Sequence, residues 1–243
     1  MYKAILFDVD DVLIRSKRFG DYFQEQTGVK AEEMLPFYKG IFRDCQAGRT
    51  DLKVELVPWL KKWGYAGDVD NFMHEWFEFE NRPDQKLLKL VKKLRDQGVK
   101  CYLATNQEKY RGDFIWEKMN FKNYFDGRFT SAEMKMSKPS KDFFEKIIVE
   151  LSKQKIEPKE ILFIDNEAVA VNSAASLGIS GHVYTKYHRL FIFLNQSRMK
   201  ILIIISVAVA LLVLSFIPFF TKSLMMGGEI KINFWQKYFM HID

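Results

Sequence analysis

The chain has 243 residues, a length that suits one large domain or a core with a small insertion. Apolar residues make up 48% and charged residues 28%, a globular composition that excludes a disordered or collagen-like chain. The formal net charge is +6, but like charges form no long block, so we expect no nucleic-acid partner. The cysteines, Cys45 and Cys101, are too few for a disulfide scaffold and predict free thiols in a reducing compartment.

Short apolar runs separated by amphipathic helical patterns predict a parallel sheet. The expected strands are 2–7, 101–105, 161–165 and 182–185. The helical patterns associated with them are 84–97, 140–151 and 168–177. Strands that alternate with helices are typical of an α/β fold, here a Rossmann-like core with helices on both faces of a parallel sheet. Because such sheets bind ligands at the carboxyl ends of their strands, Asp8, Thr105 and Asp165 are expected to lie near one another.

Residues 15–83 contain no clear strand and interrupt the first strand–helix unit. The helical patterns in this segment, all rich in aromatic residues, are 19–26, 31–45, 52–63 and 69–79. We therefore expect residues 15–83 to form an inserted helical cap over the edge of the sheet, with the core made of residues 1–14 and 84–196. The aromatic side chains are expected to form the interior of the cap rather than a platform for substrate.

A long apolar segment near the C-terminus interrupts this soluble pattern. Ile201–Phe220 contains 20 residues without a charge, enough for a helix of about 30 Å, the thickness of the hydrocarbon core of a bilayer. We expect residues 197–243 to be a hydrophobic tail whose transmembrane helix anchors the protein to a membrane. A helix buried in an oligomer and a fused second reading frame starting at Met199 are alternative interpretations. The apolar run before Asp8 is too short for a secretory signal, which predicts a cytoplasmic catalytic body.

Two carboxylates follow the first expected strand directly. Asp8 and Asp10 are separated by one residue that points away, so their side chains share one side. Paired carboxylates at a strand end suit a hard cation such as Mg²⁺. A solvated acidic turn is the alternative interpretation of the pair taken alone.

Four motifs occur in order at the expected strand ends and the loops between them. They are ILFDVDDVL at 5–13, LATNQ at 103–107, KMSKPSKDFF at 135–144 and LFIDNEAVAVNSAASLGI at 162–179. Their order resembles the haloacid dehalogenase (HAD) superfamily, and specifically its phosphatase branch with a helical cap after the first motif. The resemblance extends over roughly residues 1–195.

The resemblance implies a Mg²⁺-dependent phosphatase acting on a small phosphorylated metabolite, such as a sugar phosphate or nucleotide. Asp8 would attack phosphorus, and Asp10 would protonate the leaving oxygen and then activate the hydrolytic water. Thr105 and Asn106 would hold phosphoryl oxygens, which Lys138 would neutralise. Alternatively, Thr105 or Asn106 caps a helix, and Lys138 is a solvated surface lysine.

The metal ligands that the resemblance implies are Asp8, Asp10 through its backbone carbonyl, Asp165 and Asn166. Asn166 stands where the family usually has a second acid, so we expect weaker Mg²⁺ binding. Asp11 replaces a usual glycine, which aspartate tolerates in turn geometry.

Three activities are compatible with these motifs. Asp10 argues for phosphoryl chemistry over dehalogenation, because the dehalogenases lack this second aspartate and use no metal. The alternatives to a phosphatase are a catalytically impaired, membrane-tethered binding module that keeps the fold, and a phosphomutase. The sequence does not indicate the oligomeric state.

Overall fold

The computed structural model describes residues 2–15, 19–195 and 212. The chain divides into two units, Met1–Phe191 and Ile192–Asp243, and only residues 192–195 and 212 of the second unit are described. Within the described residues, no helix is long and apolar enough to cross a membrane. The expected span Ile201–Phe220 lies outside the described residues, apart from Leu212.

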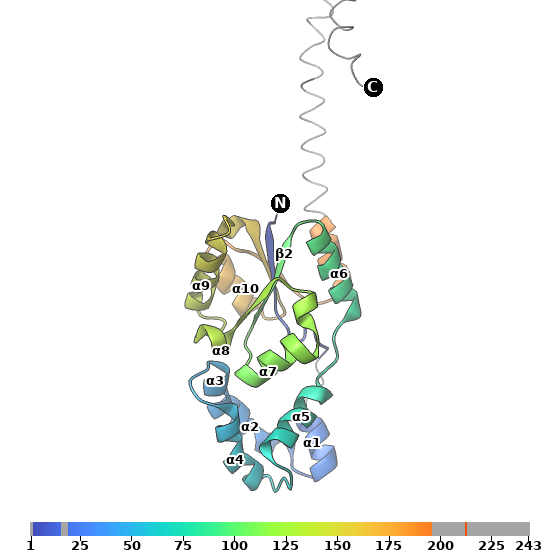
Figure 1. Cartoon of the computed structure of the whole chain (residues 1–243), viewed down its shortest axis with the longest axis vertical. Coiled ribbons are helices and arrows are strands. Elements are labelled where there is room, and N and C mark those ends of the chain that lie inside the picture. Colours follow the sequence, from blue (N-terminus) through green and yellow to red (C-terminus); the bar gives the residue numbers. More distant parts are fainter. Residues whose placement is uncertain (1, 16–18, 196–211, 213–243) are drawn as a thin grey trace, which may run out of the picture. The chain divides into compact units, whose positions relative to one another are not determined.

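Five parallel strands form the central sheet, in the order β3-β2-β1-β4-β5 (Figure 1). Their bounds are β1 (Ala4–Phe7), β2 (Lys100–Thr105), β3 (Gly127–Thr130), β4 (Ile161–Asp165) and β5 (Ser180–Val183). Phe7 is in register with Leu103 on one side and Ile164 on the other, so these three strands end at the same level. The expected parallel α/β core is therefore confirmed.

Two details of the strands differ from the sequence analysis. The strand expected at 182–185 begins earlier, because Ser180–Val183 pairs with β4. Strand β3 was not expected, since its sequence GRFT contains a glycine and an arginine instead of an apolar run. Residues 127–130 form a strand because they pair with β2 at the edge of the sheet, and not because their own sequence has a strand-like hydrophobic pattern.

Different helices cover the two faces of the sheet (Figure 1). The helical segments of the core are α6 (Gln85–Asp96), α7 (Lys109–Asp113), η1 (Phe114–Lys118), η2 (Phe121–Asn123), α8 (Ser131–Met134), α9 (Lys141–Ser152), η3 (Pro158–Glu160) and α10 (Ala168–Ala175). Helices α9 and α10 pack against one face, where they bury Leu6 and Phe163. On the other face α6 contacts β2, and Phe125 lies edge-on to Phe7 with ring centroids 5.9 Å apart. Burial on both faces accounts for the continuous apolar strands.

Residues 19–80 form a helical insertion between β1 and α6. Its helices are α1 (Phe19–Thr27), α2 (Ala31–Lys39), α3 (Ile41–Gln46), α4 (Leu52–Lys62) and α5 (Val69–Phe79). The pattern at 31–45 was expected to be one helix, but the backbone of Gly40, at φ −103° and ψ −115°, separates α2 from α3. The aromatic rings of the insertion, among them Phe37 and Phe72, pack mainly against one another.

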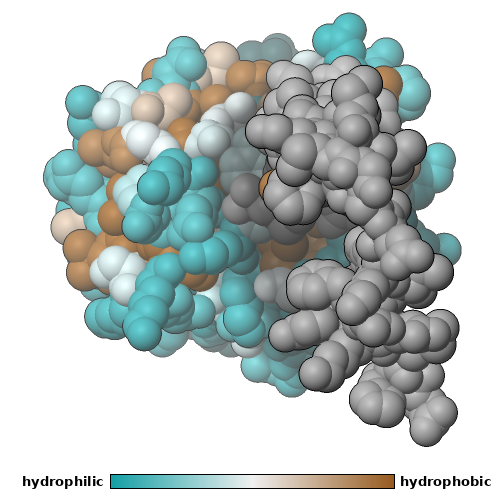
Figure 2. Space-filling model, turned by 90° about the horizontal axis from the view of Figure 1, so that it is seen from above, coloured by the Kyte–Doolittle hydropathy of each residue, from teal (hydrophilic) through white to brown (hydrophobic). Residues whose placement is uncertain are grey.

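The described surface mixes polar and apolar residues. In Figure 2, which views the molecule from above, teal hydrophilic residues surround smaller brown hydrophobic groups on the part not covered by grey atoms. Several exposed large apolar side chains are valines, including Val149 on α9 and Val169 on α10. Single exposed apolar residues of this kind are ordinary on a globular protein.

Candidate functional site

The carboxyl ends of β1, β2 and β4 bring polar groups together, as the parallel topology requires. Asp8 follows β1, Thr105 ends β2 and Asp165 ends β4, while Lys138 comes from the loop after α8. All four are buried, with exposed fractions of 0% to 8%. Asp8, Thr105 and Lys138 border a cavity of about 780 Å³. Its lining, polar except for Met136 and Pro139, consists of Asp8, Asp10, Asp11, Arg43, Gln46, Arg49, Thr105, Asn106, Lys135, Met136, Ser137, Lys138, Pro139, Ser140, Asp142, Asn166 and Glu167.

Lys138 lies between two carboxylates. Its Nζ is 2.7 Å from Asp8 Oδ1 and donates a hydrogen bond of 2.6 Å to Asp165 Oδ2. The second oxygen of Asp165 accepts a hydrogen bond from the backbone N–H of Glu167, at 2.7 Å. Because Lys138 is only 8% exposed, the alternative of a solvated surface lysine is wrong.

The electrostatics of this group favour a cation beside Asp8. Burial raises the pKa of Asp8 to about 6, and the nearby Asp165 adds to the increase although Lys138 opposes it. Burial alone would lower the pKa of Lys138, but the two carboxylates raise it above its ordinary value. One ammonium thus only partly compensates two buried carboxylates.

Asn106 holds the backbone of Lys138. Its Nδ2 donates to the Lys138 carbonyl and its Oδ1 accepts from the Lys138 N–H, both at 2.9 Å. The helix that follows, α7, is capped by Glu108, which accepts from the N–H groups of Tyr110 and Arg111. The alternative in which Thr105 or Asn106 caps this helix is therefore wrong, and Asn106 positions Lys138.

The carboxylate of Asp10 has different partners. Arg111 donates to Oδ1 at 2.9 Å and to Oδ2 at 3.0 Å, and Gln107 Nε2 donates to Oδ2 at 2.7 Å. Arg111 also forms an ion pair of 2.8 Å with Glu80, which follows α5. Burial would raise the pKa of Asp10, but the charge and hydrogen bonds of Arg111 lower it below its usual range.

Arg111 and Gln107 were not among the residues expected from the sequence. They are four residues apart and joined by a hydrogen bond of 2.9 Å, a spacing that places both side chains on one side of the chain as it enters α7. This four-residue spacing is the feature of the sequence from which Gln107 and Arg111 could have been predicted to act together. A lone arginine beside lysine and tyrosine ordinarily indicates a surface residue, and only the burial of its side chain distinguishes Arg111.

The remaining expected residues lie at the wall of the same cavity. Asn166 is exposed there, next to Asp165. Asp11 adopts φ 58°, the left-handed conformation that glycine usually provides, as its position in the motif suggested.

Within residues 2–15 and 19–195, no three His, Cys, Asp or Glu side chains form a metal-binding group. A metal here would depend on two carboxylates together with neutral oxygens.

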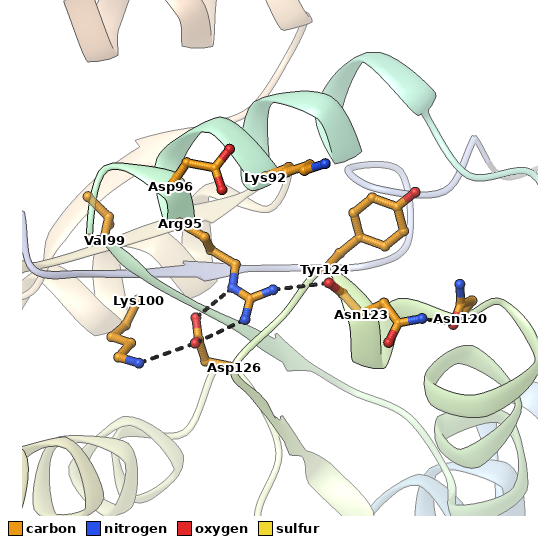
Figure 3. Close-up of a pocket in the computed structure, with 10 residues that line it drawn as sticks. Lys92, Arg95, Asp96, Val99, Lys100, Asn120, Asn123, Tyr124 and Asp126 are labelled. Carbon is orange, nitrogen blue, oxygen red and sulfur yellow. Dashed lines mark hydrogen bonds and ion pairs between the residues drawn. The ribbon is translucent and has the colours of Figure 1, made fainter.

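A second cavity, of about 590 Å³, lies where β2 begins (Figure 3). There Arg95 donates to the carboxylate of Asp126 and to the carbonyl of Asn123, and Lys100 also pairs with Asp126. These charges satisfy one another and connect α6 to the turn before β3. This arrangement favours a structural role over a ligand site.

The fold and the strand-end groups together define a Rossmann-like α/β protein with a polar site at the carboxyl ends of its parallel strands. The family model of haloacid dehalogenase-like hydrolases matches residues 2–178, so the chain belongs to this family. The resemblance of the four motifs to the haloacid dehalogenase superfamily is thereby confirmed.

Individual relatives refine this picture. A sesquiterpene phosphatase of Aspergillus oryzae is 30% identical over 100 residues, which are 41% of this chain and 50% of that protein. The chain thus spans about half the length of this curated relative.

Solved structures show the same fold. A HAD family enzyme of Bacteroides thetaiotaomicron, crystallised with magnesium and inorganic phosphate, has a TM-score of 0.65 and 24% identity, covering 79% of this chain and 100% of that one. L-2-haloacid dehalogenase of Xanthobacter autotrophicus has a TM-score of 0.54 and 17% identity, covering 74% of this chain and 76% of that one. Because the fold includes both enzymes, it does not by itself select the reaction.

Proposed function

We propose that the chain is a Mg²⁺-dependent phosphatase that hydrolyses a small, polar phosphate monoester through an aspartyl-phosphate at Asp8. The observation that carries the proposal is the buried group in which Lys138 lies between Asp8 and Asp165, on the wall of a polar cavity. This group combines a nucleophile with the positive charge that an anionic ester requires. The phosphatase relative supports the same reaction class.

The donor set suits Mg²⁺. Mg²⁺ prefers hard oxygen ligands and is commonly held by one or two carboxylates with further oxygens. Asp8 and Asp165 would supply the carboxylates, and the Asn166 side chain and the Asp10 carbonyl would supply neutral oxygens. The raised pKa of Asp8 indicates a carboxylate with incomplete charge compensation. Bound Mg²⁺ would offset the repulsion between Asp8 and the phosphoryl oxygens.

The residues divide the chemistry between two steps. In the first, an oxygen of Asp8 bonds to phosphorus while the ester P–O bond breaks, and Asp10, which has to enter this step protonated, gives its proton to the departing oxygen. In the second, Asp10 takes a proton from the water that attacks the aspartyl-phosphate, releasing inorganic phosphate and restoring Asp8. Thr105 and Lys138 hold the phosphoryl oxygens in both steps.

The cavity lining indicates the substrate class. Of the residues that border the cavity, only Met136 and Pro139 are apolar, and charged residues such as Arg43, Arg49 and Asp142 lie around it. A sesquiterpenoid chain would find little apolar surface there. A sugar phosphate or another hydroxylated metabolite matches the lining better.

Release of inorganic phosphate from a panel of phosphorylated metabolites tests the proposal. We expect turnover of polar phosphate monoesters that requires Mg²⁺ and stops with EDTA, and none in Asp8→Asn, a near-isosteric control. Wild-type protein that binds phosphate esters without hydrolysing them would support the impaired binding module instead. Transfer of phosphate to a second hydroxyl of the same sugar would indicate a phosphomutase.

A further inference from the structure

The wall of the polar cavity divides its charges between the insertion and the core. The insertion contributes Arg43, Gln46 and Arg49, which are two cations and one neutral amide. The acidic residues that the structure places at this wall all come from the core, and they are Asp8, Asp10, Asp11, Asp142 and Glu167. The core side therefore suits a cation such as Mg²⁺. The insertion side favours a negative charge on the part of the substrate that does not react.

Arg43 differs from the other cations of this wall in its contacts. Its guanidinium makes no hydrogen bond or ion pair with any residue that the structure describes. By contrast, Arg49 Nε donates to the carboxylate of Asp44 at 2.8 Å. Lys135 donates to a backbone carbonyl of the insertion, and Lys138 is shared by two carboxylates. The planar fork of Arg43 is thus available for two-point contact with a carboxylate or a phosphate.

Helix α3, which carries Arg43, is fixed to the core beside the cavity. Ser131 Oγ donates to the carbonyl of Gln46 at 2.6 Å, and Gln46 Nε2 donates to the carbonyl of Asn106 at 3.2 Å. At Gly48, just after α3, φ is 65° and a Cβ would lie 2.5 Å from a carbonyl oxygen of α8. The insertion thus packs directly on the core here. A ligand of Arg43 would therefore not have to order the backbone of α3.

We propose that Arg43 is a specificity-determining residue that binds a second anionic group of the substrate, a carboxylate or a second phosphate, away from the ester that reacts at Asp8. The inference rests on the proposed function and narrows its substrate class to small phosphate monoesters with a second negatively charged group. Two oxygens of such a group accept the parallel N–H donors of a guanidinium, whereas a hydroxyl in the same place forms a weaker, neutral contact.

Two matched pairs of substrates test this role. A carboxylate replaces a hydroxymethyl group between glycerol 3-phosphate and 3-phosphoglycerate, and a second phosphate is added between fructose 1-phosphate and fructose 1,6-bisphosphate. We expect wild type to prefer the anionic member of at least one pair by about tenfold in kcat/KM, because a hydrogen bond to a charged group is worth about that factor. The pair that shows the preference identifies the second anion as a carboxylate or a phosphate.

Arg43→Gln should lower this preference by about tenfold. The loss should come mainly from a higher KM for the anionic member, because the contact is made equally in the ground state and the transition state. Arg43→Lys keeps the charge but loses the fork, so it should retain part of the preference. Calorimetric titration of 3-phosphoglycerate or fructose 1,6-bisphosphate into Asp8→Asn protein, with and without Arg43→Gln, should show the same loss as a loss of affinity without turnover.

Arg82 supplies a matched control. It is exposed, follows the insertion and donates to the Phe79 carbonyl at 3.0 Å, and it lies outside the lining of the cavity. Arg82→Gln removes the same charge by the same substitution as Arg43→Gln. It should leave the ratio of the two kcat/KM values of each pair unchanged, which separates a contact at Arg43 from the change in net charge.

The outcomes distinguish this inference from the proposed function. A wild-type protein that turns over no ester would overturn the proposed function and the inference with it. Turnover without preference for the anionic member of either pair would overturn the inference alone. Equal losses on both members of a pair in Arg43→Gln would do the same, with Arg43→Lys deciding by the same ratio if the glutamine variant does not fold. A larger fall of the ratio in Arg49→Gln than in Arg43→Gln would contradict the assignment to Arg43.

Discussion

The two aspartates of the first motif, Asp8 and Asp10, have surroundings of similar composition that shift their pKa values in opposite directions. We call the surroundings of Asp8 the first region and those of Asp10 the second region. In the first region, Lys138 lies between the carboxylates of Asp8 and Asp165. In the second region, Arg111 lies between the carboxylates of Asp10 and Glu80. Yet the pKa of Asp8 is raised to about 6, with burial the largest cause, while the pKa of Asp10 is lowered because Arg111 outweighs burial.

The difference lies in geometry rather than in charge count. The ammonium of Lys138 makes one short contact with Asp8, whereas Asp10 accepts hydrogen bonds from both arms of Arg111 and from Gln107. The first region leaves a carboxylate that a metal ion would stabilise. The second holds a carboxylate already satisfied by the protein, in a set orientation.

Asp8→Asn tests this division most strongly. The amide cannot form an aspartyl-phosphate, so we expect kcat to fall by at least about 10⁴-fold. Asp10→Asn should slow both steps but leave measurable turnover, with phosphoenzyme accumulating when hydrolysis is slowed more. Rapid acid quench with labelled substrate measures both quantities. Comparable residual turnover in the two variants would show that Asp8 is not the nucleophile.

Lys138→Met examines the cation of the first region. Methionine has a similar length but no charge, which leaves Asp8 and Asp165 facing each other and the phosphoryl group unneutralised. We expect kcat/KM to fall by about 10²- to 10³-fold. Steady-state kinetics with saturating Mg²⁺ provides the measurement, and Lys135→Met, which changes an exposed lysine at the same cavity, serves as the control. Equal effects of the two substitutions would contradict a specific role for Lys138.

Asn166→Asp adds the carboxylate that the motif lacks. An extra negative charge beside a dication is attractive, so we expect about tenfold tighter Mg²⁺ binding and higher activity at limiting metal. Calorimetric Mg²⁺ titration of the two proteins, with Glu167→Gln as a neighbouring charge change, measures the effect. An unchanged Mg²⁺ requirement would mean that Asn166 does not approach the cation.

The pH dependence should show the smallest change. A nucleophilic carboxylate acts only when ionised, so at low Mg²⁺ kcat/KM should decline as the pH falls through about 6, the pKa of Asp8. Added Mg²⁺ favours the ionised form, and the acid limb should then move to lower pH by about one unit. Profiles at two Mg²⁺ concentrations measure the shift. A shift toward higher pH would contradict metal binding beside Asp8.

The sequence predicted the first region better than the second. Asp8, Thr105 and Asp165 end apolar runs, and a parallel sheet must bring such ends together. The pair formed by Arg111 and Asp10 joins residues 101 positions apart and depends on how α7 enters the site. Local periodicity contains no information on that packing, and it was equally unable to indicate β3 or the break at Gly40.

The aromatic interior of the insertion has an optical consequence. Trp59, Trp63 and Trp76 lie in the insertion, Trp116 lies in the core beside Arg128, and Trp235 is outside the described residues. The ring centroids of Trp59 and Trp63 are 5.7 Å apart, so the fluorescence emission of these two indoles is sensitive to small changes in helix packing. Indole fluorescence from residues 1–195 therefore observes mainly the insertion, and a spectral change on adding ligand would register movement of that part more than of the sheet.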